Sequence, residues 1–126
     1  MKLFILLTSI FIVTVSADKC SSDKSQSTKY KAKLEIKALC MNYTFKLIEG
    51  NMDTSMINTS WTDETTNKTY QNVFGFVNPC DFLPSIKEGD EFWFVIDSTT
   101  KGKECAVCLA YYPTPPKKLW IKVVDQ

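Results

Sequence analysis

The first 17 residues of this 126-residue chain constrain its fold most, because they predict that the chain folds in the secretory pathway. A positive start (Met1-Lys2) precedes an apolar stretch from Leu3 to Val13, and small residues follow at Val15-Ser16-Ala17. This order is typical of a cleaved secretory signal. The apolar stretch is about half of the ~20 residues that a membrane-spanning helix needs, so we expect a signal and no membrane anchor. Removing 17 of the 126 residues leaves a secreted, extracellular chain (18–126) with room for one domain.

Widely spaced cysteines predict a disulfide framework in a secreted domain of this size. The chain has five: Cys20, Cys40, Cys80, Cys105 and Cys108. Because five is odd, one thiol is left over, either buried, reactive or paired with a second chain, so we expect a monomer or a dimer through this cysteine. Cys105 and Cys108 also have the spacing of a redox dithiol. They do not open a helix after an early strand, as such a dithiol should, and no second pair completes a zinc site.

Composition argues against an enzyme. The chain contains no histidine and no arginine, so Ser-His and Cys-His nucleophilic catalysis cannot be built. No pair of carboxylates or lysines stands out, and we expect no catalytic residue, cofactor or metal.

Once Lys2 leaves with the signal, 14 lysines balance 14 acidic residues. A balanced chain has no general attraction to nucleic acid or to an anionic membrane.

Three Asn-x-Ser/Thr sequons begin at Asn42, Asn58 and Asn67. In a secreted chain, a sequon needs only a surface position to accept an N-linked glycan, so we expect a glycoprotein. Asn42 is the weakest of the three candidates, because it adjoins a predicted strand.

The hydrophobic pattern is mostly that of strands. From Tyr30 to Cys40, apolar and charged residues alternate, which predicts a half-buried strand. Further strands are expected at 43–48, 70–77, 92–96 and 105–112, with a polar loop or flexible hairpin at 49–68 and a turn at 87–90. The segment after Thr114 fits either a helix or an edge strand. We predict a mainly β domain, a small closed or partly closed barrel with one or two short flanking helices, because closure removes exposed edges.

Aromatic residues have two expected roles. Phe92, Trp93 and Phe94 are expected to fill the core. Tyr111, Tyr112 and Trp120 are candidate protein contacts, since tyrosine and tryptophan are enriched at binding hot spots.

Two segments resemble netrin-like modules. The segment CMNYTFKLI at 40–48 is similar to their opening strand, and NPCDFLPSIKEGDEFWF at 78–94 is similar to their cysteine, Lys-x-Gly turn and aromatic strand. Such modules occur in metalloproteinase tissue inhibitors, in the C-terminal domains of complement proteins and in small secreted nematode proteins, which this chain resembles most. The resemblance implies a five-stranded barrel like that of oligosaccharide/oligonucleotide-binding (OB) domains in residues 18–126. It also implies bridges from Cys20 to Cys80, and from Cys40 to either Cys105 or Cys108.

The function implied by this resemblance is that of a secreted, non-enzymatic module that binds host or other extracellular proteins, for example in immunomodulation. The alternative is a protease inhibitor. Tissue inhibitors chelate the protease zinc through an N-terminal Cys-x-Cys, whereas the expected start here is Asp18-Lys19-Cys20 and position 22 is a serine. The segment Gln71–Gly75 resembles the Gln-x-Val-x-Gly hairpin of cystatins, although the long cystatin helix is missing. A lipid-binding β-sandwich is a third alternative.

Overall fold

The computed structural model describes residues 27–99 and 102–126, and this part of the chain is mainly β. Its strands are β1 (Lys29–Lys37), β2 (Tyr43–Glu49), β3 (Asn58–Asp63), β4 (Lys68–Phe76), β5 (Glu91–Ile96), β6 (Lys118–Leu119) and β7 (Ile121–Val124). Its only helical segments are three short 3-10 turns: η1 (Leu39–Met41), η2 (Thr54–Met56) and η3 (Pro79–Asp81). The mainly β prediction is confirmed, and in the described residues the one or two short flanking helices that we predicted amount to these 3-10 turns. The predicted signal and Cys20 lie outside the described residues.

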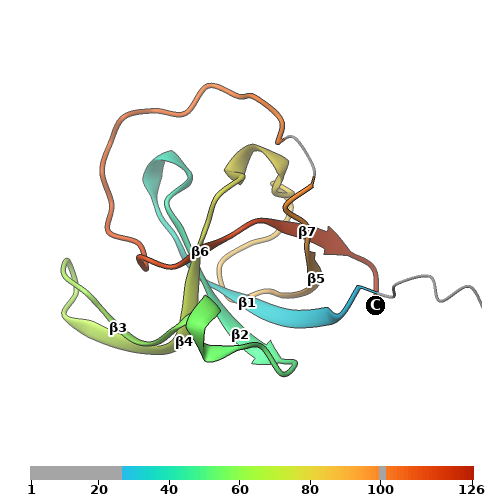
Figure 1. Cartoon of the computed structure of the whole chain (residues 1–126). Coiled ribbons are helices and arrows are strands. Elements are labelled where there is room, and N and C mark those ends of the chain that lie inside the picture. The colour runs from blue at the N-terminus through green and yellow to red at the C-terminus, as the bar shows by residue number, and fades with distance from the viewer. Residues whose placement is uncertain (1–26, 100–101) are drawn as a thin grey trace, which may run out of the picture.

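The sheet has the strand order β3-β4-β2-β1-β5-β7, with antiparallel neighbours throughout (Figure 1). The short β6 lies off this path and pairs with β4 in parallel. A single residue, Trp120, separates β6 from β7, so the C-terminal segment passes from β4 to β5. The sheet as a whole is open, and the predicted closed barrel is not confirmed.

Four of the predicted strands are present as β1, β2, β4 and β5, and the turn at 87–90 is also found. The segment after Thr114, for which a helix and an edge strand were both possible, forms the strands β6 and β7. The strand predicted at 105–112 is wrong: these residues form an irregular exposed loop, because they have no neighbouring strand to pair with. The hairpin alternative for 49–68 is the right one, since β3 lies there and pairs with β4. Its polar sequence suits an edge strand that is largely exposed to water, although Asp63 at its end is buried.

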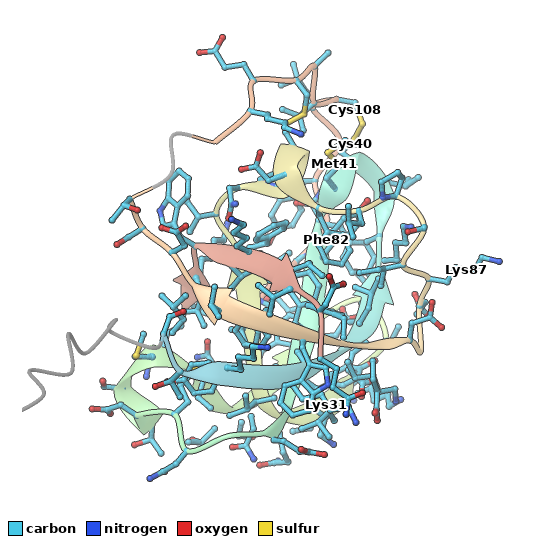
Figure 2. The ribbon with its side chains drawn as sticks, turned by 90° about the vertical axis from the view of Figure 1, so that its right-hand side faces the viewer. Lys31, Cys40, Met41, Phe82, Lys87 and Cys108 are labelled. Carbon is cyan, nitrogen blue, oxygen red and sulfur yellow. A yellow bond between two sulfur atoms is a disulfide. The ribbon has the colours of Figure 1, made fainter. Side chains whose placement is uncertain are left out.

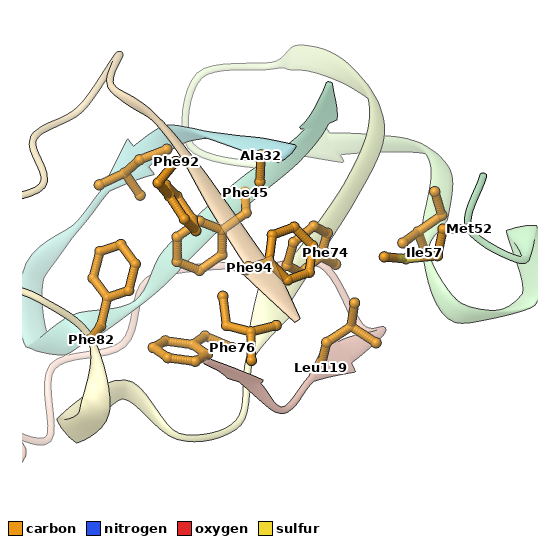
Figure 3. Packing of buried hydrophobic residues seen from close by; sticks show 12 residues of the cluster. Ala32, Phe45, Met52, Ile57, Phe74, Phe76, Phe82, Phe92, Phe94 and Leu119 are labelled. Atoms are coloured by element: carbon orange, nitrogen blue, oxygen red, sulfur yellow. The ribbon is translucent and has the colours of Figure 1, made fainter. Parts of the chain in front are cut away.

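Phenylalanines make up half of the buried hydrophobic cluster (Figure 3). The ring of Phe45 lies at the centre, with its centroid 5.2–5.6 Å from four other rings, those of Phe74, Phe76, Phe82 and Phe92. Each such pair contributes about 0.5–1.5 kcal/mol beyond the area it buries. The core prediction is confirmed for Phe92 and Phe94. It is wrong for Trp93, because alternation along β5 places this residue on the other face, where Lys31 Nζ lies 5.7 Å from its ring.

The C-terminal segment is joined to the end of β4 by backbone and side-chain bonds. Gly75 N–H donates to Lys117 O (2.8 Å), and Val77 N–H donates to Leu119 O (3.0 Å). The buried side chain of Asn78 then continues this pairing. Its Oδ1 accepts from Ile121 N–H (3.2 Å), and its Nδ2 donates to Ile121 O (3.1 Å). This seam positions the start of β6, and therefore the end of the loop that precedes it.

Candidate protein-binding loop

A long loop connects β5 to β6 and arches outward from the sheet (Figure 1). Residues 103–111 are all exposed, and from 102 to 115 the chain forms no strand, helical turn or sharp bend. Leu109 is completely exposed (100%), and Tyr111 is 83% exposed. Clustered apolar side chains in water mark a contact surface more often than a random feature of the exterior. We call residues 103–112 the contact loop.

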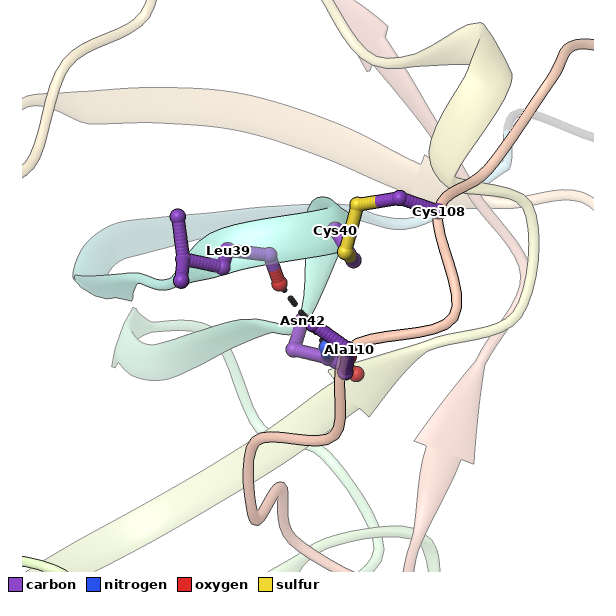
Figure 4. The surroundings of a disulfide bond; sticks show 5 residues. All are labelled: Leu39, Cys40, Asn42, Cys108 and Ala110. Atoms are coloured by element: carbon purple, nitrogen blue, oxygen red, sulfur yellow. Dashed lines mark hydrogen bonds between the residues drawn. A yellow bond between two sulfur atoms is a disulfide. The ribbon is translucent and has the colours of Figure 1, made fainter.

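From Cys108 to Tyr112, alternate residues of the contact loop are held to the body of the protein; Figure 4 shows the first two of these anchors. Cys108 is bonded to Cys40 of η1, with 5.0 Å between their Cα atoms. The carbonyl oxygen of Ala110 accepts a hydrogen bond from Asn42 Nδ2 (3.2 Å), and Tyr112 Oη donates to Asp63 Oδ2 (2.8 Å). The free side chains, those of Leu109 and Tyr111, lie between these anchors.

The turn that presents Cys40 and Asn42 is strained. Cys40 and Met41 both have left-handed backbones, with φ of 56° and 58°. For residues other than glycine this conformation costs roughly 1–2 kcal/mol each. The turn is closed by Ala38 N–H donating to Asn42 O (3.3 Å), and by the disulfide itself. Strain of this kind persists where surrounding bonds over-determine the backbone.

Two disulfides tie the contact loop to separate elements. Cys40–Cys108 joins it to the β1–β2 turn, and Cys80–Cys105 joins it to η3. The expected bond from Cys40 to one of the last two cysteines is therefore confirmed, with Cys108. The pairing of Cys80 with Cys20 is wrong, because Cys80 is bonded to Cys105. Since Cys105 and Cys108 have different partners, they do not form a redox dithiol.

Asp63 is a fully buried carboxylate that anchors the end of the contact loop. Its Oδ1 accepts from the N–H and the hydroxyl of Thr65 (2.8 and 2.7 Å), and its Oδ2 accepts from Tyr112 Oη. Burial, the largest influence, pushes the pKa of Asp63 up. The hydrogen bonds from Thr65, Tyr112 and Thr66 outweigh it and hold the pKa below its ordinary value. The charged carboxylate is thus the form that this site stabilises.

A hollow of about 510 Å³ lies beside the Cys40–Cys108 disulfide. Its rim includes the exposed side chains of Leu39 (75% exposed) and Val107 (49%), and Tyr43 lines it. In Figure 2, Cys40 and Cys108 lie at one end of the molecule and Lys31 lies toward the other. The hollow therefore brings apolar residues of η1 and of the contact loop, Leu39 and Val107, together at the end of the molecule where the disulfide lies.

The three aromatic candidates have different surroundings. Tyr111 is exposed and available to a partner. Tyr112 is half-buried, and its hydroxyl is occupied by Asp63, so it acts as an anchor of the contact loop. Trp120 is half-buried between β6 and β7, where its ring would lie 3.3 Å from a Cβ placed on Gly102.

The three sequon asparagines also differ. Asn67 is exposed in the β3–β4 turn. Asn58 is half-buried, and its Oδ1 accepts from Lys117 N–H (3.0 Å). Asn42 Nδ2 uses both of its hydrogens, donating to Leu39 O (2.8 Å) and to Ala110 O (3.2 Å). Asn67 is the site whose amide a glycan would disturb least.

Gln71–Gly75 does not form the hairpin that the cystatin-like alternative needs. It lies inside β4, where Val73 and Phe74 are fully buried. Gly75 has a packing role instead, because a Cβ there would lie 3.0 Å from Lys118 Cγ and 3.2 Å from Pro115 O. The segment therefore cannot wedge into a protease cleft in this fold.

A second hollow, of about 270 Å³, is lined by Asn78, Asp81 and Lys103 among others. Asp81 Oδ2 accepts from Asn78 Nδ2 (3.0 Å), and its Oδ1 accepts from Lys103 N–H (2.9 Å). These two bonds, with that from Asn78 the stronger influence, hold the pKa of Asp81 below its ordinary value. A carboxylate engaged in this way is a structural group, unlike a general base, whose pKa lies near the working pH.

Within residues 27–99 and 102–126, no cluster of three or more metal-ligating side chains is found. In the same residues, no helix is long and apolar enough to cross a membrane. Comparisons of the chain with protein-family models, with curated proteins and with solved structures gave no match.

The sequence did not point to Asp63, Asn42 or Leu109 as parts of this site. Asp63 lies in a polar stretch that resembles any surface loop, and only its place opposite Tyr112 shows its role. Asn42 was noticed as a sequon, whereas its amide braces the contact loop. Leu109 was assigned to a strand, where it would have been counted with the buried residues. Its place immediately after a cysteine, in an uncharged run that ends at two prolines, was the one available signal.

Proposed function

We propose that this protein is a secreted, non-enzymatic protein-binding module and that its contact loop is the binding element. The observation that carries the proposal is the alternation along the loop, in which anchored residues alternate with two exposed side chains, Leu109 and Tyr111. A loop held in one conformation loses little conformational freedom on binding, so more of its contact energy appears as affinity. Leucine and tyrosine then supply the apolar area.

The netrin-like resemblance belongs to the same proposal. The C-terminal segment supports it, because β6 on β4 and β7 on β5 bring the two sides of the sheet toward one another. We therefore propose a partly closed, OB-like arrangement. Secretion is supported by the signal-like N-terminus and by the two disulfides, which persist in oxidising compartments. The proposal also includes action on host proteins and immunomodulation, and these two features rest on the netrin-like resemblance alone.

A differential capture experiment tests the binding role. The mature, oxidised protein is compared with a variant that carries Leu109→Asp and Tyr111→Asp, and with Ile48→Asp as a matched control. Ile48 is also exposed (38%) and lies near the end of β2 that is remote from η1. After cross-linking in extracellular fluid and quantitative mass spectrometry, we expect a partner retained by the wild type and the control and lost by the double variant. A partner retained equally by all three proteins would show that the contact loop is not the binding element.

A further inference from the structure

We propose that residues Cys108 to Tyr111 bind along the substrate cleft of an endopeptidase, with Leu109 in the enzyme's primary specificity pocket. The inference rests on the proposed function, since it names the class of protein that the contact loop binds. In this arrangement the Leu109–Ala110 peptide bond lies at the catalytic groups. The chain would act as a slowly cleaved, substrate-like inhibitor.

The course of the backbone carries the first step. Endopeptidases bind their substrates as extended segments, which pair through main-chain groups and place successive side chains on opposite sides. The contact loop runs without a turn or sharp bend, and from Cys108 to Tyr112 its anchored and free residues alternate. In the described residues, no hydrogen bond engages the backbone of Leu109 or Tyr111. These groups are therefore open to pairing with a cleft.

Side-chain chemistry specifies the kind of pocket. Leu109 is the most exposed large apolar residue of the described chain (100%), and no charged residue occurs between Glu104 and Lys117. An apolar specificity pocket accepts leucine without burying a charge, whereas a pocket with an acidic residue at its base prefers lysine or arginine. Ala110, the next residue, is small and leaves space beside the bond to be attacked. The expected partner is an enzyme with an apolar pocket.

The anchors explain why binding would outlast cleavage. Hydrolysis adds one water across the Leu109–Ala110 bond and produces a Leu109 carboxylate and an Ala110 amine. Cys108 remains bonded to Cys40, and Ala110 and Tyr112 remain attached to Asn42 and Asp63. Both new ends stay in place, so that re-formation of the bond competes with release. Interfaces that are ordered before binding change little when the complex forms, and the anchored loop is an interface of this kind.

The test uses the mature, oxidised protein with two probe enzymes: chymotrypsin, whose pocket is apolar, and trypsin, whose pocket holds an aspartate. We expect the wild type to inhibit chymotrypsin and to leave trypsin active. Leu109→Lys should weaken chymotrypsin inhibition by about 100-fold or more, the size of a hot-spot loss, and should create inhibition of trypsin. Ile48→Lys, which adds the same charge at the far end of β2, should change neither.

The outcomes separate this inference from the proposed function. Loss of a captured partner by the double Asp variant, with no inhibition of chymotrypsin, would overturn the inference and leave the binding role intact. Rapid, complete cleavage at Leu109–Ala110 without inhibition would show a substrate and would also overturn it. Light scattering provides a third outcome. If the wild type is a dimer and Leu109→Lys dissociates it, the loop binds a second copy of this chain, and the inference is overturned. Thermal unfolding of each variant checks that the fold is retained.

Discussion

Tyr112 Oη donates a 2.8 Å hydrogen bond to Asp63 Oδ2, joining the end of the contact loop to a hairpin 49 residues earlier in the chain. The bond matters because Asp63 is fully buried and charged. A buried carboxylate that loses a donor has no water to replace it.

Tyr112→Phe should therefore lower the free energy of unfolding by about 1.5–3 kcal/mol, the range for a hydrogen bond to a charged group. The ring and its packing are kept, so the loss measures the hydroxyl. Denaturant titration followed by tryptophan fluorescence provides the value. Tyr111→Phe is the matched control. Its hydroxyl has no partner among the described residues, and a change above about 0.5 kcal/mol there would contradict our interpretation.

Acid should destabilise the protein through carboxylates whose folded pKa is depressed. Hydrogen bonds lower the pKa of Asp53, Asp63 and Asp81 from 3.8. Their stabilisation is complete above the unfolded value and is lost as the pH falls through the lower, folded values. We expect the free energy of unfolding to decline below about pH 4. Asp63→Asn should reduce the slope of this decline, and an unchanged slope would show that Asp63 does not contribute.

Thr44→Val should stabilise the protein. Thr44 is fully buried in β2, and its hydroxyl has no hydrogen-bond partner. Removing a buried, unpaired hydroxyl while keeping the shape recovers about 1–2 kcal/mol. The substitution also destroys the Asn42 sequon, so the measurement needs enzymatically deglycosylated protein. Thr59→Val, at an exposed position of β3, should change stability by less than about 0.5 kcal/mol.

Gly75→Ala should destabilise the seam between β4 and β6. The new Cβ would lie 3.2 Å from the carbonyl oxygen of Pro115, a backbone atom next to a buried ring. Overpacking of this kind costs typically about 1–3 kcal/mol. Gln71→Ala, on an exposed part of the same strand, is the control. Equal losses of stability in the two variants would contradict a close approach at Gly75.

Among the sequons, Asn67 should carry a glycan and Asn42 should not. Asn67 is exposed in a turn, whereas a glycan on Asn42 Nδ2 would replace a hydrogen that braces the turn or the contact loop. In protein secreted from eukaryotic cells, Asn67→Gln should remove one glycan by intact mass, and Asn42→Gln should leave the mass of attached sugar unchanged. A glycan found on Asn42 would mean that at least one of its two Nδ2 hydrogen bonds, to Leu39 O or to Ala110 O, is absent in the secreted form.

Local patterns explain which parts of the fold could be predicted. The alternation in β1 records one buried and one exposed face, and that pattern is independent of the partner strand. The segment at 105–112 is apolar throughout and does not alternate, and because it has no partner strand, its apolar content alone gave a wrong prediction. Likewise, spacing alone cannot pair cysteines, because the bond from Cys80 to Cys105 depends on where η3 lies relative to the contact loop.

The sequence by itself determined that this chain is rich in strands, buries Phe92 and Phe94, and carries enough cysteines for a bridged framework. These properties follow from composition and short-range periodicity, which act within a few residues. Only the tertiary structure decided that Tyr112 meets Asp63 and that Cys108 and Ala110 are held beside Leu109. Each of these contacts joins residues about 50 or more positions apart, and such a meeting is set by how the strands pair around a shared core.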